Sequence, residues 1–194
     1  PTHKETAMQR IGFIGASGLM GHGMAKNLRA KGYPLSITVH RNRERVADLL
    51  AAGATLAATP ADLARSSDIV FLCVTGSPQV EAAVGGAEGL LTGAARGLVI
   101  VDTSTAEPES TNRLRALCES QGVHYVDAPL ARTPVDAEAG RLNVMVGATQ
   151  AQFAQLDPDQ HLGRRTDNGL LPDTDEEHVG RWVDVTHSEV DIER

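Results

Sequence analysis

A glycine-rich segment near the beginning of the sequence constrains the fold more than any other feature. Residues 11–21 read Ile-Gly-Phe-Ile-Gly-Ala-Ser-Gly-Leu-Met-Gly, so a short apolar run is followed by glycines at positions 15, 18 and 21. The apolar run predicts a buried strand, and the periodic apolar residues after the glycines predict a helix. Gly15 allows a tight turn, Gly18 close approach of a ligand to the backbone, and Gly21 close packing of helix on strand. The segment therefore predicts a strand–turn–helix unit that opens an α/β domain.

The same alternation of strand and helix signals continues as far as residue 156. Short apolar runs typical of buried strands lie at residues 11–14, 36–40, 69–74, 98–102, 125–127 and 143–146. After the first run, Leu19, Met24 and Leu28 form an apolar stripe that Gly32 ends as a carboxyl-terminal cap. Further helix signals are Thr59-Pro60 with Asp62, Pro108 before a helix that ends near Gly122, and Thr149 with Gln152. Strands joined by helical crossovers lie parallel, so we expect a Rossmann-type doubly wound parallel sheet that binds ligands at the carboxyl ends of its strands.

The charge pattern changes after residue 156. Residues 157–194 contain 11 Asp or Glu against 4 Arg and carry the whole formal net charge of −7. This segment also lacks a sustained helical or strand period, which is typical of poorly ordered chain. We therefore expect an N-terminal arm at residues 1–9, an α/β domain at residues 10–156 and an acidic, poorly ordered tail at residues 157–194.

Composition and charge also exclude several classes of function. The negative net charge provides no basic surface for nucleic acid. The longest apolar run, residues 69–74, is too short to cross a bilayer, and residues 1–10 lack the apolar segment of a secretory signal. None of the following residues has metal-binding spacing: Cys73, Cys118, His161, His178 and His187. We expect a cytoplasmic protein with reduced, buried cysteines and without a metal, nucleic-acid or membrane partner.

The glycine-rich turn predicts a ligand as well as a fold. The free amides and the positive dipole end of a helix favour phosphates, and such a turn between a strand and a helix is typical of dinucleotide-binding proteins. A plain strand-to-helix loop is the alternative interpretation. The residues expected to hold a pyrophosphate are Gly15, Ala16, Ser17, Gly18, Leu19 and Met20.

The end of the second predicted strand indicates which dinucleotide binds. NAD-binding proteins usually place a carboxylate there for the ribose 2′-hydroxyl, whereas this sequence reads His40-Arg41-Asn42-Arg43. Arg41 lies 20 residues after Gly21, where a guanidinium pairs with the 2′-phosphate of NADP. Arginines that only face solvent at the start of the next helix are the alternative interpretation. We expect NADP as the cofactor, with NAD as the alternative.

Extended short-chain dehydrogenases also use a Gly-x-x-Gly-x-x-Gly turn, but they need a Tyr-x-x-x-Lys pair. Here Tyr33 is followed four residues later by Ile37, and Tyr125 by Pro129. The sequence therefore excludes that class.

Five groups of residues together resemble the β-hydroxyacid dehydrogenases, a family of oxidoreductases. The groups are Gly12-Phe-Ile-Gly15 with Met20-Gly21, Met24-Ala-Lys-Asn27, Asp102-Thr-Ser104-Thr105 with Pro108, Asp127-Ala-Pro129, and Glu138-Ala-Gly140 with Met145-Val-Gly147. The resemblance implies a cofactor-binding Rossmann domain, followed in complete members by a helical domain, and hydride transfer to or from a small β-hydroxyacid or its semialdehyde. By the same resemblance, Val74 and Thr75 border the cofactor, Thr105 lies near the nicotinamide, and Ser104 faces the substrate.

Two departures from the family concern binding. The family's phosphate turn has one residue fewer between its first two glycines, so the extra Ser17 adds a hydroxyl near the phosphates. After Asp127-Ala-Pro129 the family places Val-Ser-Gly-Gly, whereas this chain has Leu130-Ala131-Arg132-Thr133. Arg132 and Thr133 are therefore the candidates for the substrate carboxylate, and a solvent-facing Arg132 is the alternative.

The third departure concerns catalysis. The family takes its proton donor from a lysine at the start of the helical domain, whereas the lysines of this sequence are Lys4, Lys26 and Lys31. No catalytic residue is therefore assigned, and we expect a cofactor-binding domain with little activity alone, its partner domain replaced by the acidic tail through truncation or a frame shift. The apolar surface that such a domain would cover favours self-association into a homo-oligomer. A non-catalytic dinucleotide-binding module or an inactive remnant is the alternative function.

Overall fold

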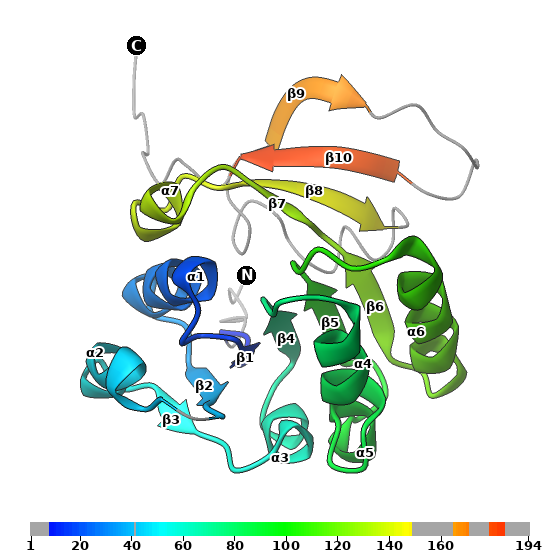
Figure 1. The fold of residues 1–194 in the computed structure, drawn as a ribbon, viewed down its shortest axis with the longest axis horizontal. Coiled ribbons are helices and arrows are strands. Elements are labelled where there is room, and N and C mark those ends of the chain that lie inside the picture. The colour runs from blue at the N-terminus through cyan, green and yellow to red at the C-terminus, as the bar shows by residue number, and fades with distance from the viewer. Residues whose placement is uncertain (1–7, 41, 149–164, 171–178, 185–194) are drawn as a thin grey trace, which may run out of the picture.

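A parallel sheet forms the centre of the protein in the computed structural model, which describes residues 8–40, 42–148, 165–170 and 179–184 (Figure 1). Its strands are β1 (Ile11–Ile14), β2 (Leu35–Thr38), β3 (Thr55–Leu56), β4 (Ile69–Leu72), β5 (Val99–Asp102) and β6 (His124–Asp127). They lie in the order β3-β2-β1-β4-β5-β6, and every pair is parallel. The order reverses direction at β1, as in a doubly wound fold, which confirms the predicted fold class.

Antiparallel strands extend the sheet beyond β6. Strand β8 (Asn143–Ala148) pairs with β6, with the short β7 (Leu130–Ala131) and with β10 (Val179–Asp184), which in turn pairs with β9 (Arg165–Leu170). The six expected strands are confirmed with ends shifted by at most two residues. Strands β3, β7, β9 and β10 were not expected. Strands β3 and β7 have only two residues each, too few to show a strand period. Strands β9 and β10 pair through their backbones at the edge of the sheet, and such pairing does not require a hydrophobic period in the sequence.

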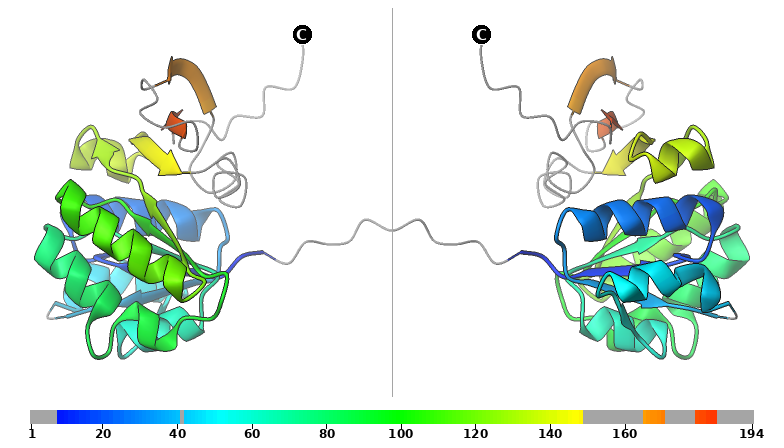
Figure 2. Two further views of the ribbon diagram at one scale, coloured as in Figure 1. Left: turned by 90° about the vertical axis from the view of Figure 1, so that its right-hand side faces the viewer. Right: turned by 90° about the vertical axis from the view of Figure 1, so that its left-hand side faces the viewer.

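Helices cover both faces of the sheet (Figure 2). They are α1 (Leu19–Ala30), α2 (Ala47–Ala51, preceded by the 3-10 turn Glu44–Val46), α3 (Pro60–Arg65), α4 (Ser77–Gly85), α5 (Leu90–Gly93), α6 (Pro108–Ser120) and α7 (Pro134–Glu138). Residues of α1 and α2 share one buried cluster with Phe13 and Val101, while α3 to α6 share another with Ile14 and Ile100. Successive strand residues point to opposite faces, so β1, β4, β5 and β6 each contribute to both clusters.

The capping signals are confirmed where the structure describes them. Thr59 accepts a hydrogen bond from the Asp62 amide at 3.1 Å with Pro60 in the first turn of α3, and Gly32 and Gly122 have positive φ after α1 and α6. The Thr149–Gln152 signal, the arm before residue 8 and the rest of the acidic tail lie outside the described residues.

The apolar stripe expected on α1 is partly wrong. Leu19 is 66% exposed, whereas Leu28 is buried and Met24 is partly buried. The buried face of α1 consists of Gly21, Gly23, Ala25 and Leu28. Small residues occupy it because the helix lies close to its neighbours, so size rather than hydropathy marks this face.

Cys118 is buried and Cys73 partly buried, both as free thiols, and burial raises the pKa of each. No helix within the described ranges is both long and apolar enough to span a membrane.

Candidate functional site

The glycine-rich turn joins β1 to α1 in the way the sequence predicts. Gly15 has a φ of +97°, and a Cβ at this position would overlap the backbone carbonyl of Cys73. A Cβ on Gly21 would overlap the Gly15 carbonyl and lie 3.2 Å from the Phe13 ring. Both glycines are therefore required by the fold itself, Gly15 in the turn after β1 and Gly21 in the first turn of α1.

Gly18 differs from the other two glycines. Its backbone is extended, with φ −80° and ψ 164°, and a Cβ there would meet only the Gly15 carbonyl at 3.2 Å. The fold thus tolerates a side chain at Gly18 with a small shift. A strict need for glycine here would come only from a ligand that approaches the backbone.

The start of α1 leaves backbone amides without partners inside the helix. Its first helical hydrogen bond is donated by the His22 amide to the Gly18 carbonyl at 3.0 Å. The amides of Leu19, Met20 and Gly21 precede that bond, so they have no partner within the helix. Together with the helix dipole, they favour an anion at this end of α1.

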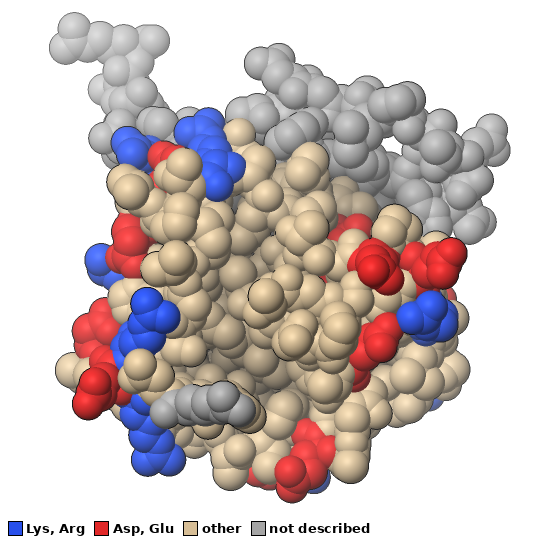
Figure 3. Space-filling view, viewed as in Figure 1, with Lys and Arg blue, Asp and Glu red and all other residues tan. Residues whose placement is uncertain are grey.

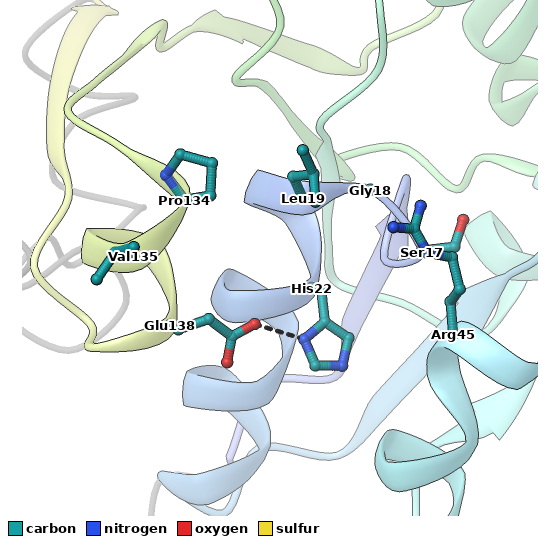
Figure 4. Close-up of a pocket in the computed structure, with 8 residues that line it drawn as sticks. All are labelled: Ser17, Gly18, Leu19, His22, Arg45, Pro134, Val135 and Glu138. Atoms are coloured by element: carbon teal, nitrogen blue, oxygen red, sulfur yellow. Dashed lines mark hydrogen bonds and ion pairs between the residues drawn. The ribbon is translucent and has the colours of Figure 1, made fainter.

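A cavity of about 360 Å³ adjoins this helix start (Figure 4). It is lined by Ser17, Gly18, Leu19, His22, Arg45, Pro134, Val135 and Glu138. Of the predicted phosphate-turn residues, the cavity brings together Ser17, Gly18 and Leu19. Ala16 is fully buried, and Gly15 lies in the turn against Cys73.

Arg45 is a cavity residue that the sequence analysis did not single out. It lies in the 3-10 turn before α2 and lines the cavity on the side of Ser17 (Figure 4). Arg45 follows Arg41 by about one helical turn, and this spacing could have indicated that Arg45 faces the same site. Arg41 itself lies outside the described residues.

The loops after β4 and β5 lie side by side because the strands are in parallel register, with Leu72 opposite Asp102. The Val74 amide donates to Ser104 Oγ at 3.0 Å, and the Ser104 amide donates to Asp102 Oδ1 at 2.9 Å. Ser104 is only 3% exposed, whereas Thr75 and Thr105 are exposed. The structure thus joins Val74 to Ser104, and the hydroxyl of Ser104 already supports the loop after β4. Its role toward a substrate stays a prediction.

A buried hydrogen bond lies beneath these loops. Tyr125 Oη donates to Asp102 Oδ2 at 2.6 Å, and both residues are fully buried. Burial, reinforced by the Asp102 carboxylate, raises the pKa of Tyr125 far above its usual range. Asp102 therefore holds the loop after β5 through its Ser104 bond and the neighbouring strand through Tyr125.

Arg132 and Thr133 lie in the loop before α7. Arg132 is exposed and has a φ of +86°, in the left-handed region that favours glycine. Thr133 is the N-cap of α7, where it accepts from the Asp136 amide at 3.3 Å and donates to Asp136 Oδ2 at 2.7 Å. The Thr133 side chain is thus committed to a capping box, and the substrate role predicted for both residues stays untested.

Helix α7 packs closely on α1, which explains why two of the family-like motifs occur together. A Cβ on Gly23 would overlap the Ala137 backbone, and Asn27 Nδ2 donates to Gly23 O at 2.7 Å and Ala137 O at 3.0 Å. Gly140 has a φ of +67° and lies against the Asn27 side chain. The Met24-Ala-Lys-Asn27 and Glu138-Ala-Gly140 groups are therefore the two sides of one contact.

The charges on this face are distributed around its margin. Figure 3 shows Lys, Arg, Asp and Glu side chains at the edges and uncharged residues over the centre, where β1, β4 and β5 lie. The candidate site thus takes its positive character from the α1 amides and Arg45 rather than from a basic patch.

Comparison with known proteins agrees with this arrangement. Residues 10–161 match the family model described as the NAD binding domain of 6-phosphogluconate dehydrogenase. The chain is 38% identical over 152 residues to 2-(hydroxymethyl)glutarate dehydrogenase of Eubacterium barkeri, a match that covers 77% of this chain and 49% of that protein. It is 37% identical over 150 residues to 2-hydroxy-3-oxopropionate reductase of Escherichia coli (strain K12), covering 77% of this chain and 50% of the relative.

A solved structure, Psf3 in complex with NADP+ and 2-OPP, superposes with a TM-score of 0.72 and 31% identity over 78% of this chain and 53% of that one. The chain therefore spans about half the length of the relatives it matches. By these matches and by its fold, the chain belongs to the β-hydroxyacid dehydrogenase family, of which it carries the N-terminal NAD-binding domain of the 6-phosphogluconate dehydrogenase type.

Proposed function

We propose that this domain binds NADP at the start of α1 and serves an oxidoreductase that transfers a hydride between the nicotinamide and a small β-hydroxyacid or its semialdehyde. The observation that carries the proposal is the cavity between the Gly15–Gly18 turn, Arg45 and α7. Its floor supplies backbone amides and its wall a guanidinium, which together suit a pyrophosphate and a further phosphate.

The preference for NADP over NAD follows from the charges at the end of β2. Arg45 lines the cavity, Arg41 follows His40, and the segment His40-Arg41-Asn42-Arg43 contains no carboxylate for a ribose 2′-hydroxyl. The carboxylate of Glu138, which also lines the cavity, is paired with Lys26 at 2.9 Å. A 2′-phosphate would therefore meet guanidinium groups rather than an unpaired acid.

The substrate class is inferred from the relatives and from one side chain. Two relatives are named for hydroxyacid or oxoacid substrates, 2-(hydroxymethyl)glutarate and 2-hydroxy-3-oxopropionate. We assign Arg132 to the substrate carboxylate, because a guanidinium binds such a group with two parallel hydrogen bonds. Ser104 then shapes the site from below through its contact with Val74.

Catalysis by these residues alone is expected to be weak. The cofactor supplies the hydride, but the alkoxide that forms needs a proton donor, and no lysine follows Lys31 in this sequence. The second candidate function is a dinucleotide-binding module without turnover of its own.

The test is a fluorescence titration of the purified chain with NADPH and NADH. We expect tighter binding of NADPH, and in Arg45→Ala a weakening of about 1–3 kcal/mol for NADPH with little change for NADH. Arg65→Ala is the matched control, because Arg65 pairs with Asp62 on α3 at the other face of the sheet. Equal affinities for both nucleotides, unchanged in Arg45→Ala, would contradict the assignment of NADP.

A further inference from the structure

His22 lies between two carboxylates that come from two other helices. Its Nδ1 is 2.6 Å from Oε1 of Glu138 on α7, and its Nε2 is 3.0 Å from Oδ1 of Asp48 on α2. An ionised carboxylate only accepts hydrogen bonds, so each ring nitrogen must carry a hydrogen and donate it. The geometry therefore requires the imidazolium form, and a neutral ring keeps only one of the two bonds.

Protonation of His22 changes the net charge beside the cavity. Ion pairs link four groups here, namely His22, Lys26, Asp48 and Glu138. When His22 is protonated, the formal charges of these four groups sum to zero. With a neutral ring they sum to −1, beside the cavity that Arg45 lines from its 3-10 turn. An added negative charge there opposes the binding of phosphates.

The other charged groups near α7 do not replace His22 as a partner of Glu138. Asp136, in the first turn of α7, pairs with Arg141 at 3.4 Å and with the Thr133 cap. Burial lowers the pKa of His22, but the hydrogen bonds and charges of Glu138 and Asp48 outweigh that effect and raise it above its ordinary value. The same contacts lower the pKa of both carboxylates.

The His22–Glu138 bond also connects two parts of the cavity (Figure 4). His22 rises from α1 beside Gly18, while Glu138, Pro134 and Val135 form the wall that α7 contributes. Loss of the bond would loosen this wall, which the Lys26–Glu138 ion pair and the Asn27–Ala137 hydrogen bond still hold on α1. The added negative charge and the change in the shape of the cavity therefore both weaken the binding of a phosphate.

We propose that His22 is a positioning residue for the dinucleotide, which in its protonated form holds α7 and α2 against α1, so that dinucleotide affinity falls when His22 loses its proton. The proposal rests on the dinucleotide site proposed above and adds a pH dependence to it. The contacts are complete at pH values between the lowered pKa values of the two carboxylates and the raised pKa of His22. One of the two hydrogen bonds of His22 is lost as the pH rises through the pKa of His22 in the folded protein.

The first measurement needs no nucleotide. An NMR titration of the His22 ring in the whole chain should show a pKa above the ordinary value of about 6.5, and Glu138→Gln should lower it. Amide exchange at Ala137 in α7 should become faster, relative to a buried β4 amide, as His22 deprotonates. A His22 that titrates at or below its ordinary pKa, or α7 exchange that does not follow that titration, would overturn the proposal.

The second measurement compares NADPH affinity from about pH 6 to about pH 8.5 in wild type, His22→Gln and His124→Gln. The 2′-phosphate of the ligand itself titrates at about pH 6, but it does so equally for every variant. From the low to the high pH, wild-type affinity should fall about three- to fivefold more than that of His22→Gln, as expected for partly exposed ion pairs. His124, at the start of β6, is the matched histidine and should leave the wild-type profile unchanged.

Each outcome of the second measurement has a definite meaning. Identical pH profiles in wild type and His22→Gln would overturn the proposal. If His22→Gln does not fold, Glu138→Gln replaces it and should move the fall in affinity to lower pH. Failure of the wild type to bind NADPH at any pH would refute the proposed function and the role of His22 in affinity, while the ring titration still decides whether His22 holds α7.

Discussion

Replacement of Arg132 by glycine should stabilise the protein. Arg132 has a φ of +86°, and an L-residue other than glycine in the left-handed region costs about 1–2 kcal/mol. Glycine removes that strain, but its freedom in the unfolded chain costs about 0.5–1 kcal/mol. The difference predicts a gain of about 0.5–1 kcal/mol in the free energy of unfolding. In a domain of this size that corresponds to a rise of about 1–4 °C in Tm.

Two further variants separate the backbone effect from loss of the side chain. Arg132→Ala removes the guanidinium but keeps the strained backbone, so its stability should stay close to that of wild type. Arg43→Gly is the matched control, because Arg43 is also exposed but has an ordinary φ of −70°. It should lose about 0.5–1 kcal/mol through chain entropy alone.

The assay is urea unfolding followed by circular dichroism, with Tm measured on the same samples. The free energy of unfolding should be highest for Arg132→Gly, lower and similar for wild type and Arg132→Ala, and lowest for Arg43→Gly. If Arg132→Gly and Arg43→Gly are destabilised to the same extent, the backbone at Arg132 is not strained and the reasoning fails.

Three other expectations can be checked directly. Gly18→Val should abolish NADPH binding in a fluorescence titration yet keep the wild-type circular dichroism spectrum, whereas Gly15→Val should unfold the domain because its side chain would overlap the Cys73 carbonyl; normal binding by Gly18→Val would mean that the phosphate turn is misplaced. Tyr125→Phe should lower the free energy of unfolding by about 1–3 kcal/mol, because it leaves a buried Asp102 oxygen without its 2.6 Å donor; a change below about 0.5 kcal/mol would show that water replaces the hydroxyl. The purified chain should oxidise NADPH with tartronate semialdehyde or methylmalonate semialdehyde more slowly than about 1 s⁻¹, and a faster rate at 340 nm would require a proton donor that we have not identified.

The sequence by itself determined the features that depend on residues close together in the chain. The strand at Ile11–Ile14, the Gly15–Gly21 turn and the Thr59 cap were predicted because each is encoded by hydropathy, backbone freedom or a hydroxyl within a few residues. The buried face of α1 was predicted poorly, since close packing selected Gly21, Gly23 and Ala25 rather than large apolar residues.

Only the tertiary structure decided which distant residues meet at the site. His22 and Glu138 are separated by 116 positions in the sequence. The strands that lie between them in the sequence must form the sheet before α7 can pack on α1. Arg45 joins Ser17 at the cavity only because β2 lies beside β1 in parallel register. The left-handed backbone of Arg132 likewise follows from the short path between β7 and the α7 cap. Register, packing and chain closure set these contacts, and no local periodicity of the sequence records them.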